Sequence, residues 1–201
     1  RGLSAGMLGG NEALASKRPD TRDAVAKAIA AVDAGLTSSA APASIVTHWA
    51  EQKQRWAALE QAVANRQLKP AESTAQHTKL IADLLALTDE VLDDFGMSLD
   101  PLADGYFLIR AAGINAPALA ERLGQMRAQG TGFLATKAIP AEGRATLIGV
   151  YSQANSSFGE MMRDLGKAST AHDGLKTQLG SKAEALKAQI AKTLSLADQS
   201  L

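Results

Sequence analysis

The side chains that could do chemistry do not form a metal-binding pattern. The chain has three histidines, His48, His77 and His172, and none has a second histidine four residues away. The helical two-histidine zinc arrangement is therefore absent. A di-iron carboxylate bundle needs a Glu-x-x-His phrase on each of two helices, and only the reversed order occurs, from His48 to Glu51. We expect no metal site and three partly exposed histidines on helical surfaces.

Nucleophilic catalysis has no better support. Ser4 lies between Gly2 and Gly6, but a serine nucleophile elbow requires a preceding strand, and we predict no strand there. We expect Ser4 on a helical surface or at an interface. The chain has no cysteine, which excludes cysteine nucleophiles and thiolate zinc sites. The phosphate-binding Gly-x-x-x-x-Gly-Lys pattern is also missing. We predict that the chain is not an enzyme and carries no cofactor.

Two groups of residues could instead bind a small anion. Tyr106 and Arg110 are four residues apart and share one face of a helix, where an arginine beside a phenol can hold a carboxylate or another small anion. Tyr151 and Asn155 belong to a polar stretch of a long helix that we expect over 140–172. A buried amide needs a neighbouring side chain, a water or a ligand, because leaving it unpaired costs about 1–3 kcal/mol. The alternative is a surface arginine beside a core tyrosine.

An acidic stretch lies at the middle of the chain. Between residues 89 and 104 the charged side chains are all acidic: Asp89, Glu90, Asp93, Asp94, Asp100 and Asp104. The simplest interpretation is a solvated rim. The alternatives are a cation site or a docking surface for a basic partner, although the spacing does not match a calcium-binding EF-hand loop.

Composition and spacing predict an all-α protein. Of the 201 residues 46% are apolar but only 4% aromatic, and alanine, the best helix former, is abundant; a β-sandwich or barrel would need more β-branched and aromatic residues. Twenty-one basic residues balance 21 acidic ones, so there is no charge signature for nucleic acid or an anionic membrane. No apolar run is long enough to span a bilayer.

Apolar residues recur at alternating spacings of three and four, which is the period of a helix. They predict helices over 3–14, 25–36, 45–63, 80–95, 147–165 and 175–201. We expect Pro70 to begin a helix, Asp100 and Pro101 to cap and start the next, and Pro117 to end that one. Long helices with short links favour antiparallel neighbours. We predict an elongated antiparallel bundle made of two stacked four-helix bundles that share long helices at the start and finish.

One segment resembles a known motif. Residues 99–108, Leu-Asp-Pro-Leu-Ala-Asp-Gly-Tyr-Phe-Leu, are similar to a phrase of the periplasmic helical sensor domains of bacterial chemoreceptors, the methyl-accepting chemotaxis proteins. A later Leu-Gly-x-x-Arg phrase fits residues 123–127. The opening residues 1–4, Arg-Gly-Leu-Ser, resemble the first helix of nitrate- and nitrite-sensing domains, whose architecture is similar to that of helical bimodular sensors.

The resemblance implies a function. Such domains are two stacked helical bundles between two transmembrane helices, and they bind small molecules in the periplasm and pass a helix shift inward. It implies that residues 1–201 are one sensor domain cut from a longer inner-membrane receptor, homodimeric at full length, with an organic acid or inorganic anion as ligand. It adds Arg1 to the candidate ligand contacts Tyr106, Arg110, Tyr151 and Asn155.

Two departures from the motif bear on the ligand. Phe107 stands where a second tyrosine is expected, and Arg110 stands where an acidic residue is expected. The reversed charge means that a relative's ligand does not carry over directly. A cytosolic helical scaffold with the acidic stretch as its docking face is the alternative function. Apolar flanking sequence of about 20 residues would support the receptor, and polar flanking sequence would support the scaffold.

Overall fold

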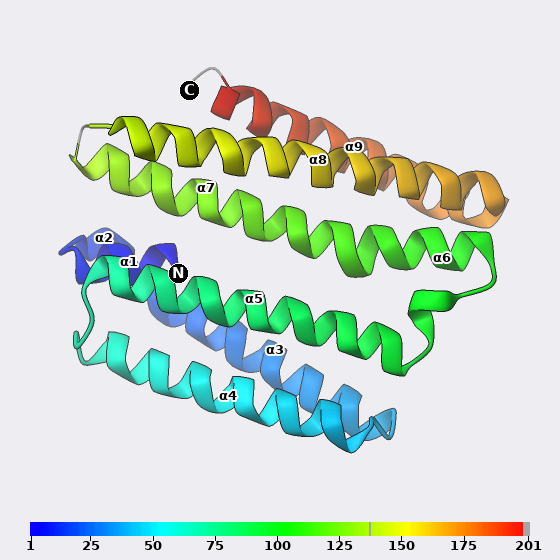
Figure 1. The fold of residues 1–201 in the computed structure, drawn as a ribbon, viewed down its shortest axis with the longest axis horizontal. Helices are drawn as coiled ribbons and strands as arrows, with labels where there is room; N and C mark the ends of the chain where they lie inside the picture. Colours follow the sequence, from blue (N-terminus) through cyan, green and yellow to red (C-terminus); the bar gives the residue numbers. More distant parts are fainter. Residues whose placement is uncertain (137, 199–201) are drawn as a thin grey trace. The chain divides into compact units, whose positions relative to one another are not determined.

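The computed structural model describes residues 1–136 and 138–198, with the side chains of 134–136 excepted, and all regular structure in these ranges is helical (Figure 1). The all-α prediction is therefore confirmed. The chain divides into two compact units, Arg1–Glu90 and Val91–Leu201. How these modules are stacked stays a prediction. No helix within the described ranges is both long enough and apolar enough to cross a membrane.

The first unit contains α1 (Gly2–Leu8), α2 (Glu12–Ala15), α3 (Arg18–Ser38), α4 (Ala43–Ala64) and most of α5 (Pro70–Asp94). Helices α3, α4 and α5 lie side by side (Figure 1). Two ion pairs join α4 to α5, Arg55 with Asp83 and His48 with Glu90. The later residue of α4 pairs with the earlier residue of α5, so these two helices are antiparallel. The core of this unit is built from α1, α4 and α5: Leu59, Val63 and Leu80, with Met7, Leu8, Trp56, Leu68 and Leu84 packed against them.

Local sequence explains where these helices begin. Pro70 starts α5 as predicted, and the Glu72 carboxylate accepts a hydrogen bond of 2.8 Å from the backbone N–H of Lys69. The single helix predicted over 3–14 is wrong. The chain turns at Gly10, whose φ of 87° lies in the left-handed region that glycine adopts without strain, and Asn11 then caps α2 by accepting from Leu14 N–H at 3.1 Å.

The second unit contains η1 (Met97–Leu99), α6 (Ala103–Ile109), η2 (Arg110–Asn115), α7 (Ala116–Thr136), α8 (Ala141–Ala171) and α9 (Asp173–Asp198). Helix α8 packs against α6, α7 and α9 (Figure 1). The long helix predicted over 140–172 is confirmed. The buried core is Ala111, Leu119, Ala154, Met161, Ile190 and Leu194.

Two predicted boundaries in this unit are wrong. Helix α6 begins at Ala103 because Asp100 accepts a 2.8 Å hydrogen bond from Leu102 N–H in a short turn before the helix. Pro117 does not end the helical run but lies in the first turn of α7. Proline cannot donate the usual α-helical hydrogen bond, and the segment directly before it, η2, is a π-helix, whose bonds run over five residues instead of four. The chain therefore stays helical through this region.

Candidate functional site

Polar side chains are buried in the first unit beside its apolar core. We define the Arg1–His77 cluster as six residues from α5 and from the starts of α1 and α3: Arg1, Ser4, Arg18, Ser73, His77 and Thr78. Ser4, Ser73 and His77 are 5%, 0% and 4% exposed. Buried polar groups need hydrogen-bond partners, so the pairing of each one in this cluster shows whether the site is complete.

The imidazole of His77 has one paired and one unpaired nitrogen. Its Nδ1 lies 2.7 Å from the backbone carbonyl oxygen of Ser73, one helical turn earlier on α5. A carbonyl only accepts, so Nδ1 carries the proton and donates it. Nε2 is fully buried and has no hydrogen-bond partner among the described residues. The edge of Trp56 meets the ring, with centroids 6.1 Å apart, and Trp56 supplies no bond to Nε2.

The electrostatic environment of His77 is positive. Burial, together with the positive charges of the N-terminal amino group, Arg18 and Arg1, lowers the pKa of His77 to about 4. Arg18 Nε donates to Ser4 Oγ at 3.3 Å, and its guanidinium is also ion-paired with Glu60 of α4. Arg1 Nη1 donates to Thr78 Oγ1 at 3.0 Å. Guanidinium and hydroxyl groups gathered in this way are the donors that hold small oxyanions.

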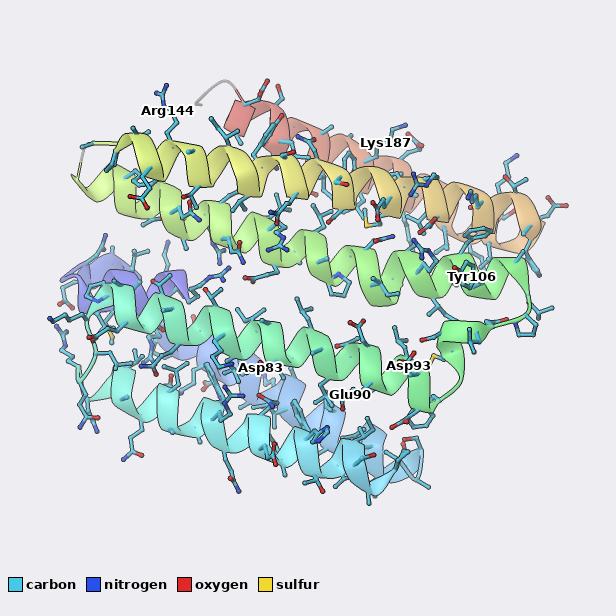
Figure 2. All side chains as sticks on the ribbon, viewed as in Figure 1. Asp83, Glu90, Asp93, Tyr106, Arg144 and Lys187 are labelled. Atoms are coloured by element: carbon cyan, nitrogen blue, oxygen red, sulfur yellow. The ribbon has the colours of Figure 1, made fainter. Side chains whose placement is uncertain are left out.

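In the second unit, the structure brings Tyr106 and Arg110 together as predicted. Tyr106 lies on α6 (Figure 2), and the guanidinium carbon of Arg110 is 5.8 Å from the centre of its ring. Arg110 Nε donates to Asp164 Oδ2 at 3.1 Å, and Asn115 Nδ2 donates to the same oxygen at 3.0 Å. The side chain of Asp164 is 3% exposed, whereas that of Arg110 is 35% exposed. The hydrogen bond from Arg110 to Asp164 raises the pKa of the arginine.

The π-helix explains how two residues reach one carboxylate. Arg110 and Asn115 are five residues apart, and in an α-helix they would point about 140° away from each other. The wider turn of η2 places them on one face. Asp164 was not predicted as a site residue. The available signal was its position in the apolar seam of α8, three residues after Met161 and four before Ala168, both of which are buried.

The structure does not bring the remaining candidates to Arg110. Asn155 and Asp164 are nine residues apart on α8 (164 − 155), or about 13 Å along a helix. Tyr151 is partly buried against the core cluster. The polar stretch of α8 was expected to be buried, which is wrong for Ser152, Gln153, Asn155 and Ser156 because all four are exposed. Arg1 belongs to the first unit. Ligand contact by any of the five candidates stays a prediction.

The predicted exposure of the histidines is partly wrong, whereas the predicted exposure of the acidic stretch agrees with the structure for its residues on α5. His48 and His172 are exposed as predicted, but His77 is buried, against the prediction. Its position offered a signal, since it shares the three- and four-residue spacing of Ser73, Leu80 and Leu84. Asp89, Glu90, Asp93 and Asp94 are exposed, in agreement with a solvated rim, and Figure 2 shows Glu90 and Asp93 on α5. In the described part of the chain, no group of three or more histidine and carboxylate side chains is placed to hold a metal ion.

Comparison with known proteins identifies the family. A sequence model of the family described as nitrate and nitrite sensing matches residues 1–199, which is nearly the whole chain. No curated protein and no solved structure matches the chain. The match agrees with the helical fold. The chain therefore belongs to the nitrate and nitrite sensing family, a family of helical sensor domains.

Proposed function

We propose that this chain is the periplasmic sensor domain of a bacterial transmembrane chemoreceptor and that it recognises nitrate, nitrite or a similar small oxyanion. The family supports the ligand class, and the Arg1–His77 cluster is the single observation that carries the placement of the site. It combines two guanidinium groups with buried hydroxyls. The receptor context, including a homodimer and flanking membrane helices, follows the resemblance to chemoreceptor sensor domains.

The chemistry of nitrate fits such a cluster. Nitrate is flat and singly charged, and two of its oxygens match the planar edge of a guanidinium group. Removing an anion from water is costly unless donors replace the lost water. Arg1, Arg18 and the hydroxyls of Ser4 and Thr78 are donors of the required kind.

The cluster also suggests how binding produces a signal. Arg1 precedes α1, Arg18 is the first residue of α3 and His77 lies in α5. An anion that contacts all three favours the arrangement in which these helices approach most closely. A ligand shifts an equilibrium between helix packings only if it binds one packing better. In the intact receptor, that shift would be passed to the membrane helices.

Thermal unfolding with added sodium nitrate and sodium nitrite tests this proposal, with sodium chloride as the salt control. Binding to the native state raises the melting temperature. We expect Arg18→Gln to abolish the nitrate-dependent rise and Arg22→Gln to retain it, because Arg22 lies one turn later on α3 and its side chain is 55% exposed. Arg18→Gln alone leaves the Glu60 carboxylate without its partner, and the double variant with Glu60→Gln removes that charge as well. The nitrate-dependent rise of each variant is measured from its own melting temperature without nitrate. A full rise in both Arg18 variants would contradict the placement.

Arg110 and Tyr106 are a second candidate, because the arginine is one-third exposed and a guanidinium has further donors besides the Nε–H held by Asp164. The same assay separates the two sites. If Arg110→Ala keeps the full nitrate-dependent rise in melting temperature, nitrate does not bind at Arg110 and Tyr106. If Arg110→Ala loses the response while Arg18→Gln keeps it, the site belongs beside Tyr106.

A further inference from the structure

The unpaired nitrogen of His77 restricts the form in which an anion can bind beside it, provided that the cluster is the anion site proposed above. With Nδ1–H committed to the Ser73 carbonyl, the neutral ring presents only the Nε2 lone pair, which is buried without a partner in the described part of the chain. An oxyanion beside that nitrogen would place lone pair against lone pair. A neutral His77 therefore disfavours a bare anion.

Protonation reverses this interaction. An N–H on Nε2 turns the nitrogen into a donor, and the ring becomes a cation that attracts the anion. We propose that the Arg1–His77 cluster takes up its anion together with one proton, which is held on Nε2 of His77. The anion accepts the new hydrogen bond, and the positive ring balances the negative charge brought into a buried site.

The surroundings of His77 and a bound anion act on the imidazole in opposite directions. Burial and the charges of the N-terminal amino group, Arg18 and Arg1 hold the pKa of His77 at about 4. A bound anion supplies the opposite charge, so the pKa rises on binding. By thermodynamic linkage, an anion that raises the pKa of His77 also binds more tightly when His77 is protonated. Nitrate affinity should thus rise as the pH falls.

Between pH 5 and 6, His77 is the group near the anion that can supply this pH dependence. The positive charge of the N-terminal amino group also lowers the pKa of His77, but an amino group of this kind titrates near pH 8 and stays protonated in that window. Arg1 approaches from the start of α1, and Arg18 approaches from α3 with Glu60 of α4 as its ion-pair partner. Trp56 of α4 and Ser73 and Thr78 of α5 are uncharged. Arginine does not lose its proton in a protein, and nitrate stays an anion throughout the range from pH 5 to 8.

Calorimetric titration of the chain with sodium nitrate at pH 5.5 measures the proton directly. Two buffers of different ionisation enthalpy give the number of protons taken up on binding. We expect close to one proton for the wild type and for His48→Gln, a control in which the exposed histidine of the same unit is removed, and close to none for His77→Gln. Between pH 5 and 6 the wild-type Kd should rise up to about tenfold, which is the limit for one linked proton.

The outcomes separate this inference from the proposed function. Nitrate binding by the wild type without proton uptake would overturn the inference and leave anion sensing intact. No binding of nitrate or nitrite at any pH from 5 to 8 would overturn both. If His77→Gln does not fold, the wild-type protein alone decides: the ¹⁵N shift of Nε2 should move to the protonated position when nitrate is added at pH 5.5, and an unchanged shift in the presence of bound nitrate would contradict the inference.

Discussion

The two units bury polar side chains in different ways. In the second unit, the Asp164 carboxylate receives hydrogen bonds from both Arg110 and Asn115, so a negative charge meets a positive charge and a neutral donor. In the first unit, His77 lies among positive charges and keeps an unpaired Nε2. Both groups are almost inaccessible to solvent: Asp164 is 2% exposed and His77 is 4% exposed.

This difference separates a structural network from an incomplete site. A buried charge is retained when it is paired and hydrogen-bonded, and the network around Asp164 meets that requirement within its own unit. A buried nitrogen without a partner is rare in folded proteins and calls for an explanation. A ligand that supplies the missing interaction is such an explanation. The first unit is therefore the better candidate for binding, and the second for rigidity.

The largest expected effect comes from breaking the network of the second unit. Asp164→Ala leaves the donors of Arg110 and Asn115 without their acceptor, although the guanidinium group of Arg110, whose side chain is one-third exposed, regains some water. We expect a loss of about 3 kcal/mol in the free energy of unfolding, measured in urea. Arg163→Ala, at the exposed neighbouring position, should change it by less than about 0.5 kcal/mol. A loss below about 1 kcal/mol for Asp164→Ala would show that the carboxylate is not the centre of a structural network.

The next effect is a pH dependence of stability that comes from the first unit. The pKa of His77 is lowered from 6.5 to about 4, so between these values the unfolded chain binds more protons than the folded one. Stability then falls as the pH decreases through this window. Between pH 7 and 5 the wild type should lose about 2 kcal/mol more than His77→Gln, measured by urea unfolding at each pH. Equal losses in the two proteins would contradict the buried neutral imidazole.

Saturating nitrate should reduce that difference at pH 5, because the anion favours the protonated ring. His48 contributes in the opposite direction, since its hydrogen bond with Glu90 raises its pKa. Stability from that pair is present at low pH and is lost as the pH rises through the raised pKa. His48→Gln is therefore the background in which the contribution of His77 is measured most cleanly.

Much of the fold could be predicted from the sequence because the signals are local. The apolar spacing in 140–172 and Pro70 at the first position of α5 depend on near neighbours, and so does the pairing of Tyr106 with Arg110 over one turn. The contact from Arg110 to Asp164 joins positions 54 residues apart, and no local pattern indicates it. The burial of His77 likewise depends on α1 and α4 packing over one face of α5.

The smallest expected effect comes from removing the unpaired nitrogen of the first unit by substitution. His77→Phe replaces the ring with an apolar one and removes the unpaired Nε2. Because an unsatisfied buried acceptor costs about 1–3 kcal/mol, we expect a gain of about 1 kcal/mol in the free energy of unfolding at pH 7.5, along with weaker nitrate binding. A loss of more than about 2 kcal/mol would mean that the imidazole stabilises the unit by itself.

The most direct test of the account is a nitrate titration followed by the backbone amide signals of the ¹⁵N-labelled wild-type chain at pH 5.5. The account predicts that the largest shifts fall at the start of α1, at Arg18 of α3 and on α5 from Ser73 to Thr78, with little change around Arg110 and Asp164. Shifts confined to α6, η2 and the facing part of α8 would contradict it and would place the anion in the second unit.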